Sequence, residues 1–188
     1  MGDTTDQVRW TTSDIELLPE NGTRYEIVDG ELFMSRQPHW HHQITCGNIF
    51  SVLQDWSLRS GLGQANITPG LVFGDSDNVV PDVVWASNET LAVLMDAAGH
   101  LTGAPELAVE VLSLGAENER RDREAKLKLY ATRGVQEYWI ADWRARRLEV
   151  YRRERATLRL VATLLAADEL TSPLLPGFAC PVARLFPQ

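Results

Sequence analysis

Two acidic residues interrupt segments that otherwise have the apolar composition of buried β-strands. Asp82 lies in VVPDVVW, and Glu110 lies in PELAVEVLS. Because side chains at i and i+2 share one face of a strand, Glu110 shares its face with Ala108 and Leu112. A lone ionised carboxylate buried there is costly, so each residue must be protonated, paired or bound to a cation.

The two carboxylates together point to metal chemistry. Taken singly, each is better interpreted as a helix cap or as the partner of an arginine. Two facing carboxylates on successive predicted strands, however, repel each other and raise each other's pKa unless a divalent cation lies between them. Oxygen ligands suit Mg²⁺ or Mn²⁺ better than zinc. The sequence therefore predicts a magnesium or manganese site at Asp82 and Glu110.

The segment DREAKLKLY places Asp122, Lys126 and Tyr130 at i, i+4 and i+8, on one face of a predicted helix. Spacing alone favours an ordinary Asp–Lys pair on the surface, worth a few tenths of a kcal/mol. The alternative is an ammonium that reaches the metal site, where it orients the attacking water and balances the charge of a phosphate.

Three histidines, His39, His41 and His42, surround a predicted helix start. The sequence contains no HExxH pattern and no second Cys/His cluster, which argues against a histidine zinc site. A contact between one of these histidines and the substrate or the metal ligands is the better interpretation. The sequence also lacks a P-loop, a Rossmann glycine fingerprint and a Gly-x-Ser-x-Gly elbow.

The composition is that of an ordered globular protein, with 44% hydrophobic and 23% charged residues in 188. A formal net charge of −8 argues against a non-specific nucleic-acid coat protein but leaves room for a nuclease. The N-terminus does not resemble a secretory signal, and no apolar stretch is long enough to cross a bilayer. Cys46 and Cys180 have no paired spacing, which is typical of the cytoplasm.

Periodicity and turn residues predict interleaved strands and helices, and hence a mixed α/β or α+β fold. Asp29-Gly30 suits a tight hairpin within RYEIVDGELFMS. A capping box of Ser13 and Glu16 is expected to open a short helix. We expect one domain over 1–188, with a short N-terminal extension over 1–11. The further expected elements are helices His39–Leu58, 88–98 and Glu117–Arg133, and strands 64–73, 79–85, 106–112, 136–141, 147–152 and 158–164.

The order of these motifs resembles the Uma-two family of putative restriction endonucleases, within the PD-(D/E)XK nuclease superfamily. The resemblance rests on YEIVDGEL, a histidine that opens a helix, PDVVW, LAVEVLS, DREAKLKLYATRGVQEYWIAD, LEVYR and LLPGF, and it runs from Thr12 to Phe186. It implies a restriction-endonuclease-like core, in which a central mixed sheet is flanked by the two long helices.

The resemblance also implies roles for particular residues. Asp82 and Glu110 match the superfamily's metal ligands, Glu26 matches a family glutamate that adds a carboxylate, and Lys126 matches the family's helical lysine. The Val111 carbonyl is an expected further ligand. His41 best matches the family histidine, with His42 as the near alternative, and His41 and Tyr130 are expected to contact the substrate or the ligands.

Two departures from the family pattern concern the segment that must deliver the lysine. Leu114 replaces a proline that is usual in the family, and the span from Glu110 to Lys126 is about two residues longer than usual.

The expected activity is Mg²⁺- or Mn²⁺-dependent hydrolysis of DNA phosphodiester bonds. The alternatives are a catalytically silent binding or assembly module with the same fold and a metal-dependent hydrolase of another phosphoester. Nuclease domains of this size often act as dimers, so we expect a homodimer if Trp40, Trp56 or Trp143 is exposed.

Overall fold

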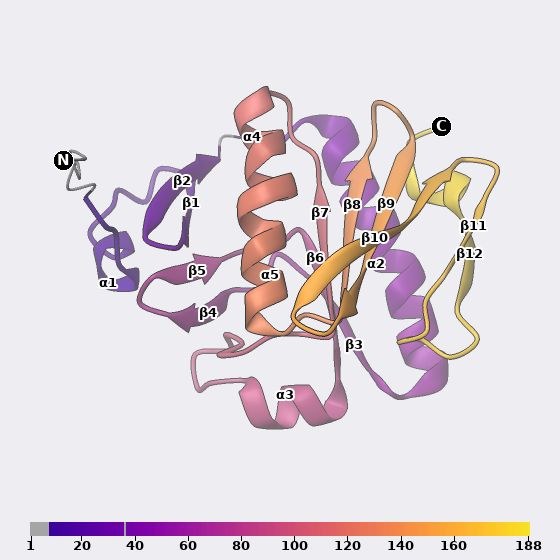
Figure 1. Cartoon of the computed structure of the whole chain (residues 1–188), viewed down its shortest axis with the longest axis horizontal. Coiled ribbons are helices and arrows are strands. Elements are labelled where there is room, and N and C mark those ends of the chain that lie inside the picture. Colours follow the sequence, from indigo (N-terminus) through magenta and orange to yellow (C-terminus); the bar gives the residue numbers. More distant parts are fainter. Residues whose placement is uncertain (1–7, 36) are drawn as a thin grey trace.

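The computed structural model describes residues 8–35 and 37–188, and its centre is a mixed six-stranded sheet (Figure 1). The strand order is β10-β9-β8-β7-β6-β3, in which β7 and β8 are parallel and every other neighbouring pair is antiparallel. The expected mixed α/β architecture is confirmed. The strands are β3 (Gly63–Ile67), β6 (Val83–Ser87), β7 (Leu107–Val111), β8 (Glu137–Asp142), β9 (Arg147–Glu154) and β10 (Thr157–Leu165).

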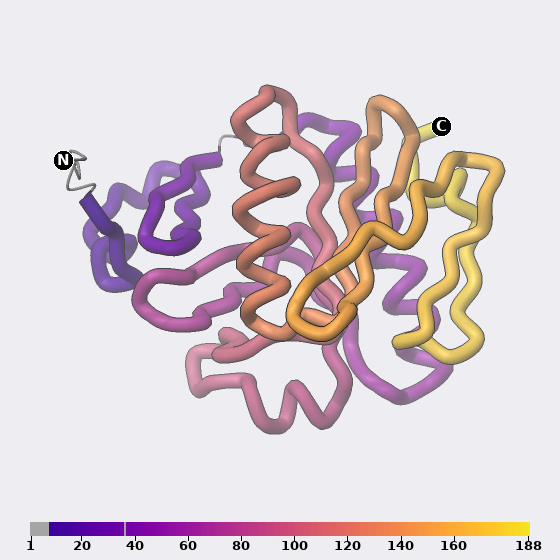
Figure 2. Tube along the Cα trace, in the orientation of Figure 1, coloured from indigo at the N-terminus to yellow at the C-terminus, as the bar shows by residue number. Residues whose placement is uncertain are grey.

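A second, four-stranded antiparallel sheet has the order β2-β1-β5-β4. Figure 2 shows its two hairpins side by side, next to the short helix α1 (Thr12–Ile15). Asp29 and Gly30 form the predicted turn, with positive φ angles of 51° and 76°. The strands are β1 (Arg24–Val28), β2 (Glu31–Ser35), β4 (Leu71–Gly74) and β5 (Asp77–Val79).

Long helices lie on opposite faces of the six-stranded sheet, as the sequence predicts (Figure 1). On one face lies α2 (Trp40–Ser60), which begins after His39 and ends at Gly61 in the left-handed conformation. On the other face, one continuous helical segment contains α4 (Ala116–Arg120), the π-helix η1 (Arg121–Lys126) and α5 (Leu127–Arg133). The remaining elements are α3 (Asn88–Leu94), β11 (Glu169–Thr171), β12 (Ala179–Pro181) and the 3-10 helix η2 (Val182–Leu185).

Strand β7 separates two hydrophobic clusters in the alternation that its sequence predicts. Val109 and Val111 pack in the cluster that includes residues of α2. Ala108 and Leu112 pack in the cluster that includes residues of α5. Glu110 therefore points toward the face that carries the π-helix, from a strand whose residues are all buried.

Two predicted strands are each divided between the two sheets. The segment 64–73 forms β3 and β4, with Thr68 at a φ of 50° between them. The segment 79–85 contributes to β5 and β6, and the break falls at Pro81-Asp82. Proline lacks the backbone N–H that a continuous ladder needs. Asp82 consequently lies at the junction of the two sheets rather than within a strand.

The structure also bears on the expected capping box of the first helix, on the N-terminal extension and on the exposure of the tryptophans. Helix α1 begins after Thr11, and Asp14 accepts the Thr11 backbone N–H at 2.8 Å, so the expected Ser13–Glu16 capping box is wrong. Residues 1–7 of the expected N-terminal extension lie outside the described residues. Trp56 is buried and donates to the Pro176 carbonyl, whereas Trp40 is 77% exposed.

None of the helices in the described ranges combines the length and the apolar character needed to span a bilayer.

Candidate active site

Three buried carboxylates line one pocket of about 150 Å³. Glu26 comes from β1, Asp82 from the junction before β6, and Glu110 from β7. The register that pairs Val83 with Val109 brings Asp82 next to Glu110. Further pocket residues are Gly22, Arg24, Ser35, Gln37, Pro38, His42, Ser113, Arg121 and Lys126. The junction of the two sheets thus gathers the three carboxylates predicted as metal ligands.

Lys126 lies within this pocket and is 1% exposed. Its Nζ atom lies 2.8 Å from Oε1 of Glu26 and 2.8 Å from Oε1 of Glu110. The surface Asp–Lys pair favoured by spacing alone is therefore wrong. A buried ammonium instead joins two carboxylates that come from different sheets.

Asp122, Lys126 and Tyr130 share one face as their spacing predicts, but this face is buried, and the π-helical segment adds Arg121 to it. A π-helix bonds i to i+5, so it uses more residues per turn than an α-helix and shifts the positions that face the core. Arg121, Asp122 and Lys126 are all buried in η1. Asp122 pairs with Arg121, Nε to Oδ1 at 3.0 Å, and its Oδ2 lacks a hydrogen-bond partner among the described residues.

Asp82 is held by several donors. Its Oδ2 accepts the Val111 backbone N–H at 2.8 Å and lies 3.4 Å from Nε2 of His42, and its Oδ1 lies 3.4 Å from Nη1 of Arg24. Burial opposes ionisation, but the bond and charge of His42 outweigh it, and the pKa of Asp82 is lowered. The pKa of His42 is raised, because Asp82 outweighs the burial of the imidazole. Asp82 is therefore a stabilised carboxylate even in the metal-free protein.

The pKa of Glu110, unlike that of Asp82, is raised, chiefly because the carboxyl is buried. Burial, joined by the negative charges of Asp82, Asp122 and Glu26, raises its pKa to about 8 although Lys126 opposes the shift. The Tyr130 hydroxyl donates to Glu110 Oε1 at 2.9 Å, which places Tyr130 beside a proposed ligand.

The charge on Glu26 is better compensated. Burial opposes its ionisation too, but Lys126 and Arg121 outweigh that effect and lower its pKa. Its Oε1 also accepts the Val80 backbone N–H at 2.8 Å.

The structure distinguishes the neighbouring histidines of α2. His42 is buried and lines the pocket beside Asp82. His41 is exposed and meets the ring of Trp143 edge-on, with centroids 5.5 Å apart, while His39 stacks on the same ring. His42 therefore lies beside the proposed ligand Asp82, in the position that the family resemblance assigned to His41.

With the geometry in place, the sequence can be compared with known proteins. A family model described as "putative restriction endonuclease" matches residues 12–183. The chain belongs to the Uma2 family. No curated protein matches the sequence. The crystal structure of a putative nuclease of DUF820 from Anabaena variabilis superposes with a TM-score of 0.73 at 18% identity, covering 94% of this chain and 97% of that one. This likeness concerns the fold.

The Uma2 match confirms the family resemblance recognised from the motifs. It supports a nuclease-like function at the level of the family. The structure brings Asp82, Glu110, Glu26, Lys126 and Tyr130 together, and their roles stay predictions.

Sequence reasoning missed three side chains around this Uma2 site. Arg24 precedes Glu26 by two positions on β1, and strand alternation alone would have placed both on one face. Cys46 follows His42 by four positions on α2, so helical spacing would have placed them together. Arg121 gave no such signal, because its burial depends on the π-helix.

Residues 119–133 and 144–155 are rich in arginine, and most of these arginines pair with carboxylates of the protein. The ion pairs are Arg121–Glu26, Arg121–Asp122, Arg123–Glu149, Arg133–Asp77, Arg144–Glu119, Arg144–Asp142, Arg147–Asp142, Arg147–Glu149 and Arg152–Glu137.

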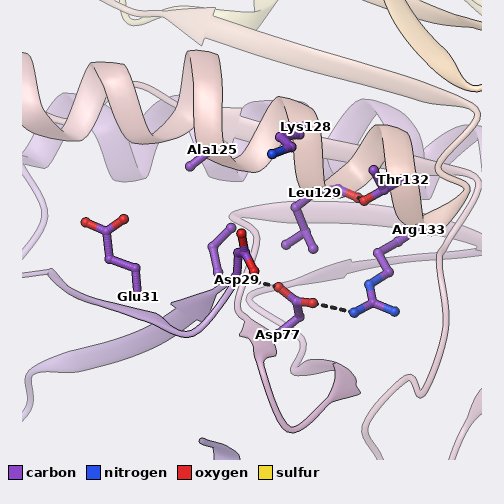
Figure 3. Close-up of a pocket in the computed structure, with 9 residues that line it drawn as sticks. Asp29, Glu31, Asp77, Ala125, Lys128, Leu129, Thr132 and Arg133 are labelled. Carbon is purple, nitrogen blue, oxygen red and sulfur yellow. Dashed lines mark hydrogen bonds and ion pairs between the residues drawn. The ribbon is translucent and has the colours of Figure 1, made fainter. Parts of the chain in front are cut away.

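A larger cavity of about 470 Å³ lies between the β1–β2 hairpin, Asp77 and the helix of residues 125–133 (Figure 3). Asp77 accepts the Asp29 backbone N–H at 2.7 Å and pairs with Arg133. Asp77 is thus satisfied within the protein, and of the other two acidic residues in the lining, Asp29 pairs with Arg9 and Glu31 comes from β2.

Proposed function

We propose that this Uma2-family protein is a metal-dependent endonuclease that hydrolyses DNA phosphodiester bonds. One observation carries the proposal: the buried carboxylates of Glu26, Asp82 and Glu110 converge in one pocket with the buried ammonium of Lys126. A purely structural ion pair needs no third carboxylate. A hydrolytic metal site needs both several oxygen ligands and a cation that can approach the substrate.

The residues present fit Mg²⁺ or Mn²⁺. Carboxylate oxygens are the ligands that these ions prefer. Burial and the neighbouring carboxylates raise the pKa of Glu110, and a divalent cation bound there would offset both effects. Asp82, Glu110 and Glu26 would hold the ion, and the Val111 carbonyl would add a main-chain oxygen. When bound, such an ion polarises a phosphate and lowers the pKa of water.

The other residues orient the reacting groups. Lys126 would position the attacking water or stabilise the negative charge that develops on the phosphate. Tyr130 fixes the orientation of Glu110 through its 2.9 Å hydrogen bond. The Val111 N–H and His42 both contact Oδ2 of Asp82 and fix its orientation. This arrangement favours hydrolysis over the silent module, whose fold would not require a buried lysine shared by two glutamates.

We further propose that the protein acts in the cytoplasm as a homodimer. Buried free thiols at Cys46 and Cys180 are compatible with a reducing compartment. Of the three tryptophans considered, Trp40 has the exposure that a symmetric contact needs. Light scattering at micromolar concentration should give twice the mass of the chain, and a monomeric mass would exclude the dimer.

Incubation with supercoiled plasmid and Mg²⁺ or Mn²⁺ tests the activity directly. We expect metal-dependent nicking by the parent and none by Asp82→Asn or Glu110→Gln. Cleavage of small phosphodiesters without plasmid nicking would favour the other hydrolase. If neither metal raises the melting temperature and no substrate is cut, the binding module is the better description.

A further inference from the structure

One cluster of potential metal ligands is not explained by magnesium chemistry. It consists of His42, Cys46 and Asp82, each 4% exposed. His42 and Cys46 lie four residues apart on α2 and therefore on one helical face, and Asp82 faces them from the sheet junction. One ligand atom from each residue can be chosen so that all three lie within 4.8 Å of one another.

The individual distances are close to those of a zinc site. Nδ1 of His42 lies 3.5 Å from Sγ of Cys46, and Nε2 of His42 lies 3.4 Å from Oδ2 of Asp82. Zinc binds sulfur at about 2.3 Å and nitrogen or oxygen at about 2.0–2.2 Å, so tetrahedral ligand atoms lie roughly 3.4–3.6 Å apart. Because the two contacts involve opposite ring nitrogens, one ion bound by all three residues requires the imidazole or the carboxylate to turn.

The donor types distinguish this cluster from the carboxylate centre. Thiolate and imidazole donors select zinc and similar borderline-soft ions, whereas magnesium avoids sulfur. Asp82 is the member common to both groups. A carboxylate oriented into a zinc site is no longer free to complete a magnesium site with Glu26 and Glu110.

We propose that His42, Cys46 and Asp82 form a zinc site that shares Asp82 with the carboxylate centre, so that zinc and magnesium exclude each other. Zinc is then an inhibitory ligand of this chain. Zinc binding depends on His42 and Cys46 of α2. The magnesium ligands Glu26 and Glu110, in contrast, come from the two sheets. The exclusion rests on the proposed function, but zinc binding by His42 and Cys46 does not.

Zinc titration followed by calorimetry tests the binding. The parent should bind one zinc ion per chain, and Cys46→Ser and His42→Ala should each weaken the affinity at least about tenfold. Cys180→Ser is the matched control, because Cys180 is also free and buried but bonds to the Pro181 carbonyl. It should bind zinc as the parent does. Equal zinc affinity in Cys46→Ser and the parent would overturn the site.

Cobalt provides a second readout that does not depend on the stability of a variant. Co²⁺ bound by the parent or by Cys180→Ser should give the intense absorption of a thiolate–cobalt bond. Excess Mg²⁺ should reduce that absorption. Cobalt binding without the thiolate absorption would exclude Cys46 as a ligand even if Cys46→Ser fails to fold.

Three variants separate this proposal from the proposed nuclease. Cys46→Ser should lose zinc affinity and keep the rise in melting temperature with Mg²⁺. Glu110→Gln should keep zinc affinity and lose the rise with Mg²⁺. Asp82→Asn should lose both the zinc affinity and the response to Mg²⁺. Zinc binding that requires Cys46 in a protein that ignores Mg²⁺ would support the zinc site and count against the nuclease. Mg²⁺-dependent nicking with zinc affinity independent of Cys46 would support the nuclease and overturn the zinc site.

Discussion

The ammonium of Lys126 lies 2.8 Å from Oε1 of Glu110, although 16 residues separate the two in the chain. Both side chains are almost completely buried. The lysine reaches the carboxylate because a π-helical segment carries it toward the strand. The pKa of Glu110 nevertheless stays raised, because the effect of burial, joined by the neighbouring carboxylates, outweighs that of the ammonium.

The two principal carboxylates should respond differently to neutralisation. Glu110→Gln resembles the protonated Glu110 that burial and like-charged neighbours favour, so the metal-free variant should melt at or above the temperature of the parent. Asp82→Asn removes a carboxylate that holds His42 and the Val111 N–H, so it should destabilise the protein by about 3–5 kcal/mol. Urea unfolding in EDTA measures the free energy of unfolding of both variants. Equal destabilisation would contradict the difference in their surroundings.

Replacement of Lys126 by methionine should destabilise the metal-free protein, because Glu26 and Glu110 lose their shared partner. Breaking a buried pair typically costs about 3–5 kcal/mol. Mg²⁺ should restore part of this stability and still bind, while plasmid nicking is lost. Lys128→Met is the matched control: Lys128 is exposed on the same helix and should tolerate the change. A Lys126→Met variant as stable as Lys128→Met would mean that the pair contributes little.

The stability of the metal-free protein should depend on pH through Glu110. Its pKa rises from 4.5 to about 8 on folding, so the folded protein holds a proton that the unfolded chain releases. The free energy of unfolding should therefore decrease as pH rises from about 5 to about 8. Thermal unfolding in EDTA across this range should show the decrease in the parent and much less of it in Glu110→Gln. If the stability of the parent and of Glu110→Gln changes with pH in the same way, groups other than Glu110 cause the dependence.

His41 and His42 are adjacent in the chain but differ in their surroundings, so variants of the two can be compared directly. His42→Ala removes the imidazole beside Asp82, so nicking should fall at least about tenfold and the metal affinity should weaken. His41→Ala alters an exposed ring against Trp143 and should affect both much less. Nicking rates and Mg²⁺ titrations of the two variants measure the difference. A larger loss of nicking in His41→Ala would return the substrate contact to His41.

Much of the architecture could be predicted from the sequence, because local signals determine it. Alternation in LAVEVLS identified the two faces of β7, and Asp29-Gly30 and Gly61 ended their elements as expected. The division of segment 79–85 escaped prediction, since a continuous apolar run does not reveal that Pro81 separates two sheets.

The chemistry at Glu110 and Asp82 could be recognised from carboxylates in apolar surroundings, but their partners could not. Helical spacing placed Asp122, Lys126 and Tyr130 on one face but did not reveal that this face is buried, and the burial of Arg121 depends on the π-helix. The choice between His41 and His42 depended on the rotation of α2 relative to the sheet, which spacing within one helix does not determine.

Glu26 belongs to the four-stranded sheet, whereas Glu110 belongs to the six-stranded sheet. A local opening that separates the two sheets would disperse the carboxylates and leave each sheet's own backbone pairing intact. A cation that requires all three oxygens binds the closed form alone and stabilises it by mass action. Amide protons of β1 and β5 should then exchange with deuterated solvent more slowly as the cation concentration rises, which makes the small sheet a reporter of the occupancy of the centre.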